Sequence, residues 1–473
     1  MKVSRTLENF KKNSIYAISS QLSGLFLSFF IALIIPKFLG VIEFSYWQLF
    51  LFYVNYLGLL HFGLNDGIYL KYGGQRREEL PLQQLAKQFT ILTISQFFIM
   101  IIVLLLSFFI ENAQRKTIWI AVALYLPLVN INGFIGYLLQ SINEIYLYSI
   151  SVIIDKIIII VGVLSLIFFN YRDFAIYIYV YVFSKLISTL YLYNRSRKVT
   201  RFNFNIHLSD WKETKILISS GIKLMFANIM GTLILGLNRK LVDIFWGIEA
   251  FGRFSFAISL TNFFLLFISQ VSIVIFPALR RINKEKLKNI FTFGNIILNR
   301  ILLGGLLLYL PVSIFLKHWL PAYTLSIDYL CYLLPIFIFD GKMQIINNTF
   351  FKVLRKEKEM LLINILALTI SGILGIIVAF SSRNMNLMIL ILVISIGFRS
   401  LIAELYFKNM FDQGSLDEMI WLYVLILTFT LSNLYIGNVW GSVIYLLFYL
   451  LYLYLSFSKL KEAVAFFYNK TKK

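Results

Sequence analysis

Long apolar runs alternate with short polar segments along almost the whole chain. A helix needs about 20 mostly apolar residues to cross a bilayer, and fourteen runs come close to or exceed that length. They lie near 14–36, 41–63, 88–110, 118–140, 145–169, 174–193, 216–237, 251–277, 290–316, 327–349, 361–380, 386–406, 419–436 and 440–457. This pattern predicts an all-α polytopic membrane protein with about 14 transmembrane helices.

The composition supports this fold class. Of 473 residues, 59% are hydrophobic and 14% are charged, whereas a soluble domain has about 45–50% and about 25%. A net charge of +21 would suggest nucleic acid in a soluble protein. Here the charges lie between apolar runs, so we expect them to set topology and to meet anionic membrane lipids. No nucleic-acid partner is predicted.

The distribution of basic residues predicts the orientation. With the N-terminus in the cytoplasm and alternating spans, cytoplasmic segments hold 29 Lys and Arg and external segments hold nine. Cytoplasmic loops carry such an excess, so both termini are predicted inside. The external links are all short, which predicts no extramembrane catalytic domain and a protein that is not an enzyme.

Two sets of matching positions indicate an internal duplication. Gly40 and Phe44 match Gly247 and Phe251 at a shift of 207 residues. At a shift of 208, a second set matches Pro127, Asn132, Gly133 and Gln140 to Pro335, Asp340, Gly341 and Asn348. Six spans separate the copies, so the repeats are parallel. We predict a six-helix lobe at 1–200, a second at 201–410, and two further helices with a basic cytoplasmic tail at 411–473.

Ionisable residues inside or at the edges of the apolar runs are the candidate functional residues. Such residues are rare in spans and often functional, and Lys and Arg bind phosphate. The cations chosen as substrate-binding candidates are Lys37, Lys223, Arg239, Lys240 and Arg300. Asp340, near mid-span, is the candidate for coupling to an ion or proton. For Lys223, Arg239 and Lys240, snorkelling to the headgroups is an equally open alternative.

Other intramembrane charges lead to simpler expectations. Asp155 and Lys156 are neighbours, and neighbours on a helix do not face each other, so each is expected to need its own partner. Lys185 lies nearer a span end and is expected to snorkel. Asp340 and Lys342 are two residues apart, so only one is expected to face the polar stripe of its helix.

Soluble-enzyme chemistry has no signature here. The chain has no G-x-x-x-x-G-K-[ST] phosphate loop, and no cofactor is predicted. Its three histidines are far apart in sequence, and Cys331 is its single cysteine. A metal site is therefore not expected.

Several short motifs resemble those of polysaccharide-unit flippases in the multidrug/oligosaccharidyl-lipid/polysaccharide exporter superfamily. The family joins its first two spans by a motif like R-x-L-G-P-x-x-[FY]-G, and residues 37–45 here read KFLGVIEFS. Residues 61–67 read HFGLNDG, like a family pattern D/H-x-G-L-x-x-A. Residues 238–254, with Asn238, Gly247 and Gly252, and residues 276–281, FPALRR, resemble two further patterns. Val41 and Ser45 depart from the first motif.

The resemblance implies two six-helix lobes around a central cavity and transport by alternating access. It implies export of an undecaprenyl-diphosphate-linked oligosaccharide across the bacterial inner membrane, for surface polysaccharides such as O-antigen. A polysaccharide polymerase and a chain-length regulator are the protein partners it implies. In this interpretation Arg239 and Lys240 lie at the outer end of the cavity. Two alternatives stay open: a cation-coupled multidrug antiporter of the same superfamily, and a membrane glycosyl polymerase or ligase.

Overall fold

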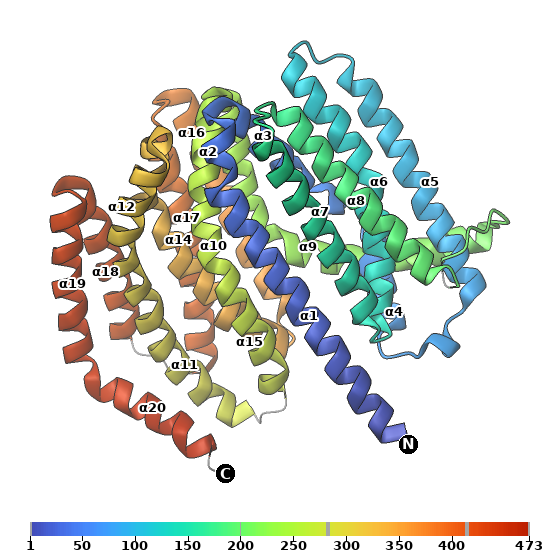
Figure 1. Cartoon of the computed structure of the whole chain (residues 1–473). Helices are drawn as coiled ribbons and strands as arrows, with labels where there is room; N and C mark the ends of the chain where they lie inside the picture. Colours follow the sequence, from blue (N-terminus) through green and yellow to red (C-terminus); the bar gives the residue numbers. More distant parts are fainter. Residues whose placement is uncertain (1, 199, 281–283, 412–415, 472–473) are drawn as a thin grey trace. The chain divides into compact units, whose positions relative to one another are not determined.

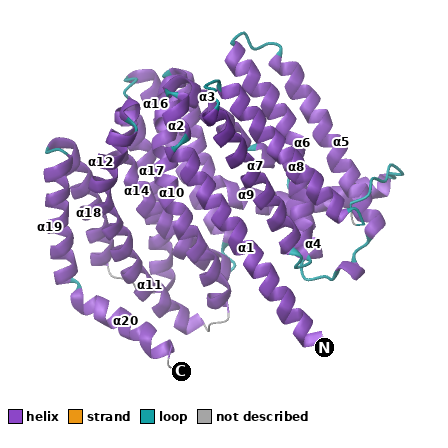
Figure 2. Ribbon diagram, in the orientation of Figure 1, coloured by secondary structure: helices purple, strands orange, loops and turns teal. Residues whose placement is uncertain are grey.

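The chain folds into helices joined by short turns (Figures 1 and 2). The computed structural model describes all residues except 1, 199, 281–283, 412–415 and 472–473, and the described residues contain no strand. The predicted all-α fold class is confirmed. Eleven helices among the described residues are long and apolar enough to cross a membrane, and a broken pair, Leu208–Phe226 with Ile229–Phe245, makes up to twelve. The count of fourteen spans stays a prediction. The family-like motif FPALRR at 276–281 ends at Arg281, which lies outside the described residues.

The chain divides into two compact units, Met1–Ile229 and Met230–Lys473. The division falls within α9 (Leu208–Phe245), later than the repeat boundary predicted at 200/201. Contacts explain this position, because the segment after residue 200 packs on the first unit. The Asn203 amide donates to Thr90 Oγ1 at 2.9 Å, and Lys87 Nζ donates to Asp210 Oδ2 at 2.9 Å.

Unit 1 begins with long and short helices that follow the apolar runs. The second predicted span, at 41–63 (span 2 from here on), is interrupted: an α-helix over 41–54 is followed by a 3-10 turn over 57–61, and a second short helix begins at residue 64. The elements are α1 (Lys2–Leu33), α2 (Ile35–Leu39), α3 (Val41–Val54), η1 (Leu57–His61), α4 (Leu64–Tyr72), η2 (Arg77–Glu79), α5 (Leu82–Ser107), α6 (Ala113–Ser141), α7 (Ile145–Phe168), α8 (Phe174–Ser196) and the first part of α9.

Aromatic and aliphatic side chains fill the core of unit 1. Trp47 is fully buried and meets the edges of Tyr177 and Tyr181, with ring centroids 6.3 and 5.7 Å apart. Phe89 and Phe134 join α5 to α6 with centroids 5.4 Å apart. These rings bury large apolar areas and hold α3, α5, α6 and α8 in fixed positions around the polar groups described below.

A backbone contact attaches the first part of α9 to the break in span 2. Gly63 lies between η1 and α4 with φ +82°, a conformation that glycine adopts without strain. A Cβ built on Gly221 would lie 1.9 Å from the Gly63 carbonyl oxygen, and a Cβ on Gly67 would lie 2.3 Å from the Leu217 oxygen. Only residues without side chains allow this approach.

Unit 2 also consists of helices joined by short turns, and among the described residues three helices follow residue 411, where the predicted second lobe has ended. Its elements are the rest of α9, α10 (Gly247–Arg280), α11 (Lys284–Gly305), η3 (Leu306–Leu308), α12 (Tyr309–Trp319), η4 (Pro321–Tyr323), α13 (Thr324–Asp328), α14 (Leu330–Lys342), the π-helical turn η5 (Met343–Asn347), α15 (Asn348–Val353), α16 (Glu357–Ser381), α17 (Met385–Phe411), α18 (Leu416–Tyr435), α19 (Asn438–Leu455) and α20 (Phe457–Thr471). The last three helices pack on α11.

Local geometry at the matched positions agrees with the duplication. Gly40 and Gly247 both have positive φ, +75° and +84°, and each lies where a long helix begins. Pro127 and Pro335 both lie inside helices, α6 and α14. Asn132, on α6, donates to Ser188 on α8 at 3.5 Å, and its match Asp340, on α14, pairs with Arg399 on α17. Corresponding spans are thus bonded to corresponding partners in the two units.

The backbone contact makes a direct prediction for stability. We expect Gly221→Ala to lower the thermal midpoint of the purified protein, with a loss of about 1–3 kcal/mol or more, because the added methyl group overlaps the Gly63 carbonyl. Gly24→Ala is the matched control, since a Cβ there meets nothing within 4 Å. Equal midpoints for the two variants would contradict the packing of α9 on span 2.

Candidate functional site

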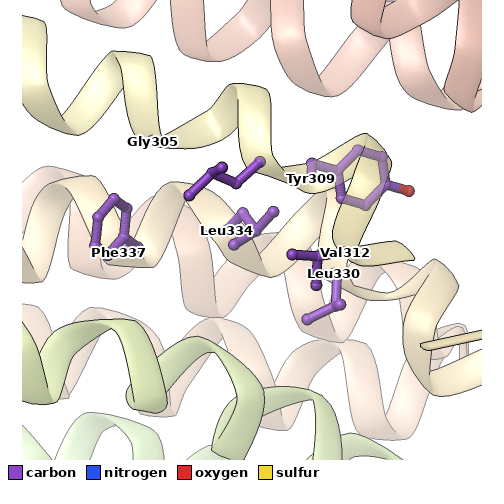
Figure 3. Close-up of a pocket in the computed structure, with 7 residues that line it drawn as sticks. Gly305, Tyr309, Val312, Leu330, Leu334 and Phe337 are labelled. Atoms are coloured by element: carbon purple, nitrogen blue, oxygen red, sulfur yellow. The ribbon is translucent and has the colours of Figure 1, made fainter. Parts of the chain in front are cut away.

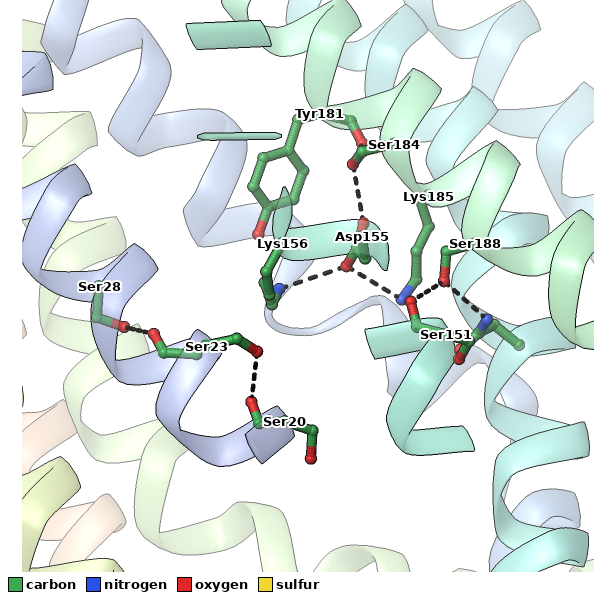
Figure 4. Close-up of polar contacts among 12 residues, drawn as sticks. Ser20, Ser23, Ser28, Ser151, Asp155, Lys156, Tyr181, Ser184, Lys185 and Ser188 are labelled. Atoms are coloured by element: carbon green, nitrogen blue, oxygen red, sulfur yellow. Dashed lines mark hydrogen bonds and ion pairs between the residues drawn. The ribbon is translucent and has the colours of Figure 1, made fainter. Parts of the chain in front are cut away.

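A charge cluster lies between α7 and α8 of unit 1 and consists of Asp155, Lys156 and Lys185 (Figure 4). Asp155 Oδ2 is 3.3 Å from Lys156 Nζ and 3.6 Å from Lys185 Nζ. The other carboxylate oxygen accepts a hydrogen bond of 2.8 Å from Ser184 Oγ. Because α7 and α8 are apolar candidate spans, this cluster is a set of charges held within the membrane-spanning part of the unit.

By formal charges, two lysines against one carboxylate, the cluster carries one positive charge more than its carboxylate can neutralise. The side chain of Asp155 is 2% exposed, that of Lys185 is 11% exposed and that of Lys156 is 20% exposed. A buried charge is costly unless it is paired, so the arrangement favours a further anion near the more accessible ammonium group. Figure 4 shows Lys156 on the side of the cluster towards α1, which packs along α7.

Two expectations about this cluster were wrong. Asp155 and Lys156 do contact each other, although neighbours on a helix diverge, because the long lysine side chain bends back to the carboxylate. Lys185 does not snorkel: it is buried and shares the same carboxylate. Asp155 was the signal that could have identified the partner of both lysines, since it is the acid beside Lys156 and lies in the helix before Lys185.

A second polar network of unit 1 stabilises the break in span 2. Asn130 Nδ2 donates to Gln96 Oε1 at 2.7 Å and to the Leu57 carbonyl at 3.1 Å. Gln96 in turn donates to the Leu60 carbonyl at 2.9 Å. The two amides therefore satisfy backbone oxygens that the 3-10 turn η1 leaves outside a regular α-helix. We assign this network a structural role.

In unit 2, two ion pairs join α14 to α17. Asp340 contacts Arg399, and Lys342 Nζ is 2.7 Å from Glu404 Oε2. Only one of Asp340 and Lys342 was expected to face the polar stripe of the helix, yet both side chains reach α17. The pairs immediately precede the π-helical turn η5, and such turns are frequent at functional sites. Arg399 also donates to the Gly231 carbonyl of α9 at 3.4 Å.

Arg300 lies in a network that ties α11 to the last helices of unit 2. Its guanidinium group is 3.2 Å from Glu418 Oε1 and donates to the Ser456 carbonyl. Tyr452 donates to the same carboxylate at 2.7 Å, and its ring lies against the guanidinium at 5.1 Å. Arg300 and Glu418 are both about 5% exposed, so each charge is neutralised where it lies.

The other predicted site residues lie apart from these networks. In unit 1, Lys37 of α2 and Lys223 of α9 are exposed. In unit 2, Arg239 Nε donates to Ser255 Oγ and its guanidinium lies 5.3 Å from the Phe251 ring, and Lys240 pairs with Asp243 at 2.8 Å. Arg239 thus contacts α10, whereas Arg300 contacts α18 and α19, so the structure does not bring these two cations into one site within unit 2.

Each unit also contains a hollow among its described residues. In unit 2, an apolar pocket between α11–α12 and α14 is lined by Gly305, Leu308, Tyr309, Val312, Leu330, Leu334 and Phe337 (Figure 3). In unit 1, an open polar groove at the beginnings of α3, α6 and α8 is lined by residues that include Glu43, Gln114, Arg172 and Asp173. Among the described residues, no three His, Cys, Asp or Glu side chains gather as in a metal site.

The ion pair of Arg300 can be tested by mutation. Arg300→Gln and Glu418→Gln should each destabilise the protein by about 3–5 kcal/mol, because each leaves a buried charge without its partner. The double variant should recover much of this loss, and thermal unfolding of all four proteins measures the coupling. Additive losses would show that the two side chains act independently.

The chain was compared with protein families, with curated proteins and with solved structures. A family model described as "Polysaccharide biosynthesis protein" matches residues 10–283, more than half of the chain. No curated protein matches the chain. Among solved structures, the chain is similar to the lipid II flippase MurJ in an inward closed conformation, with a TM-score of 0.63 and 14% identity over 98% of this chain and 99% of that one.

The chain is also similar to multidrug resistance MATE family transporters of the MOP superfamily. The inward-facing structure gives a TM-score of 0.62 at 12% identity over 82% of this chain and 94% of that one. The outward-facing structure gives 0.57 at 14% identity over 85% and 95%. At such identities the likeness shows the fold, and it confirms the transporter fold that the sequence motifs predicted.

Proposed function

Since the chain belongs to the polysaccharide biosynthesis protein family, we propose that it moves an undecaprenyl-diphosphate-linked oligosaccharide across the bacterial inner membrane. The transport would proceed by alternating access of two lobes to a cavity, with no catalytic step. Both the lipid II flippase MurJ and the MATE transporters share this fold. The multi-pass apolar helices of both units suit a substrate whose prenyl tail stays in lipid.

The observation that carries the proposal is the surplus positive charge of the Asp155–Lys156–Lys185 cluster. Two lysines share one carboxylate inside a candidate membrane-spanning layer, where a net charge is poorly screened. A diphosphate would supply the missing negative charge, and Lys156 is the more accessible of the two ammonium groups. An organic cation would instead be repelled, which disfavours the multidrug antiporter alternative.

Four other cations, two exposed and two partly buried, supply further proposed contacts. Lys37 and Lys223 in unit 1, and Arg239 and Lys240 in unit 2, are proposed to meet the diphosphate at different stages of transport, the last two at release. Arg300 could join them only if its pair with Glu418 opened. Asp340 could couple transport to a proton or cation by exchanging its partner Arg399 for that ion.

The setting of the protein is part of the proposal. Both termini would lie in the cytoplasm, and a polysaccharide polymerase and a chain-length regulator would act on the exported unit. A glycosyl polymerase or ligase activity of the chain itself has little support, because the links between the candidate spans of the described chain are short and offer no separate catalytic domain.

Lys156→Met tests the proposal while leaving the fold intact. The variant keeps a neutral Asp155–Lys185 pair, so the thermal midpoint should change little. In proteoliposomes, flipping of a polyprenyl-diphosphate-linked oligosaccharide should fall by about tenfold or more, the effect of losing one charge-assisted contact worth about 1.5–3 kcal/mol. Enzymatic modification of the sugars that reach the outer surface measures the rate.

Lys358→Met is the matched control for this experiment. It removes the same charge from an exposed position of α16, and its rate should equal that of the unaltered protein. An unchanged rate for Lys156→Met would remove the cluster from the transport pathway. Absence of flipping by the unaltered protein, with drug efflux in its place, would favour the antiporter.

The coupling role of Asp340 leads to a separate prediction. Asp340→Asn combined with Arg399→Gln removes both charges together, so no unpaired buried charge remains. If Asp340 binds the coupling ion, the double variant should equilibrate substrate but no longer respond when a proton or sodium gradient is imposed. A gradient response equal to that of the unaltered protein would exclude Asp340.

A further inference from the structure

The first part of α9 presents an exposed face on which apolar and cationic side chains alternate. We call this face the α9 strip; it consists of Leu208, Trp211, Lys212, Lys215 and Ile216. The three apolar side chains are 82%, 54% and 68% exposed, and both lysines are exposed. At 100° per residue the five positions lie within an arc of about 140°.

The opposite face of the same helix segment is fixed to unit 1. Thr214, Leu217 and Gly221 are buried, and Gly221 makes the backbone approach to Gly63 described above. The segment therefore cannot turn its apolar side chains inwards. In Figure 1 this part of α9 runs across the long helices of unit 1, as expected for a helix that lies along a membrane surface rather than through it.

The charges of the region are unbalanced in favour of cations. The preceding linker contributes Arg197, Lys198 and Arg201, all exposed. Asp210, the acid in the first turn of α9, is occupied by Lys87 and by the His207 amide. The other acid of the segment, Glu213, is exposed, so residues 197–216 hold five Lys and Arg against two acids. The linker also exposes Phe202 and Phe204, whose rings stack 6.1 Å apart.

From this combination we infer that the α9 strip docks on anionic phospholipid headgroups at the membrane surface. Trp and Leu insert at the boundary between headgroups and acyl chains, and Lys snorkels to the phosphates. A juxtamembrane basic segment is attracted to anionic lipid by each of its charges. In water, the three exposed apolar side chains would remain hydrated at a cost; at the interface they are buried.

The docking has a consequence for the chain, because the strip lies on the helix α9 within which the first unit ends, at Ile229. Anionic lipid fixes the segment that leads into unit 2 against the headgroup plane. This inference does not depend on the proposed substrate.

A fluorophore beside the strip tests the inference. Ser209 is exposed at the edge of the strip, and Cys331 is the single cysteine of the chain. In the full chain with Cys331→Ala, Ser209→Cys gives one attachment point for an environment-sensitive dye. In vesicles that contain phosphatidylglycerol, the emission should rise and shift to the blue relative to vesicles of phosphatidylcholine alone, and high salt should reverse part of the shift.

Two lysine variants identify the side chains responsible. Lys212→Gln with Lys215→Gln should raise the phosphatidylglycerol content that gives half of the shift by about tenfold. The matched control, Lys352→Gln with Lys358→Gln, removes the same charge from exposed positions of unit 2 and should leave it unchanged. Circular dichroism and thermal midpoints establish that all variants are folded.

Three outcomes would overturn the inference. The first is equal emission in the two kinds of vesicle. The second is an equal response of the Lys212/Lys215 variant and the unaltered protein. The third is a shift that needs added polyprenyl diphosphate and is absent with phosphatidylglycerol, which would assign the strip to substrate instead. In the last case flipping would persist in phosphatidylcholine vesicles, so the proposed function would stand.

Discussion

A charge inside an apolar helix layer has to be neutralised by a group of the same layer, and much of the internal architecture of both units follows from this constraint. Arg300 and Glu418 join α11 to α18, while Lys342 and Glu404 join α14 to α17. Breaking such a pair is costly although forming it contributes little net stability. The pairs therefore act mainly by excluding other arrangements of the helices. In unit 1, the Asp155 cluster departs from neutrality, and that departure is what points to a ligand.

The sequence predicted those parts of the fold that depend on local pattern. Apolar runs identified the helices, and the pairs Gly40–Gly247 and Pro127–Pro335 located corresponding positions that prove to share local geometry. The run predicted as one span at 216–237 contains the break between Leu208–Phe226 and Ile229–Phe245. Hydropathy measures transfer into lipid and carries no information about the direction of a helix, so the break was not visible. The contact that fixes this segment joins Gly63 to Gly221, and these two residues are far apart in the sequence.

The candidate site was predicted as a set of residue types rather than as an arrangement. Lys156, Lys185, Arg300 and Asp340 all stood out as charges in apolar runs. Their partners are distant in sequence: Lys185 lies 30 residues from Asp155, and Arg300 lies 118 residues from Glu418. Only tertiary structure selects among the available acids. Counting acids as well as bases within the second predicted lobe and in the two helices after it would have identified Glu404 and Glu418 as neutralising groups. It would also have shown which cluster keeps a surplus.

The two ion pairs between α14 and α17 also constrain how unit 2 can move. On α14 the acid Asp340 precedes the base Lys342, whereas on α17 the base Arg399 precedes the acid Glu404. Sliding α17 along α14 by the spacing of its two charges would bring Glu404 towards Asp340, so attraction would become repulsion between two carboxylates. The order of the charges thus favours one alignment of α17 relative to α14. The two pairs therefore oppose sliding of α17 along α14 while both remain formed.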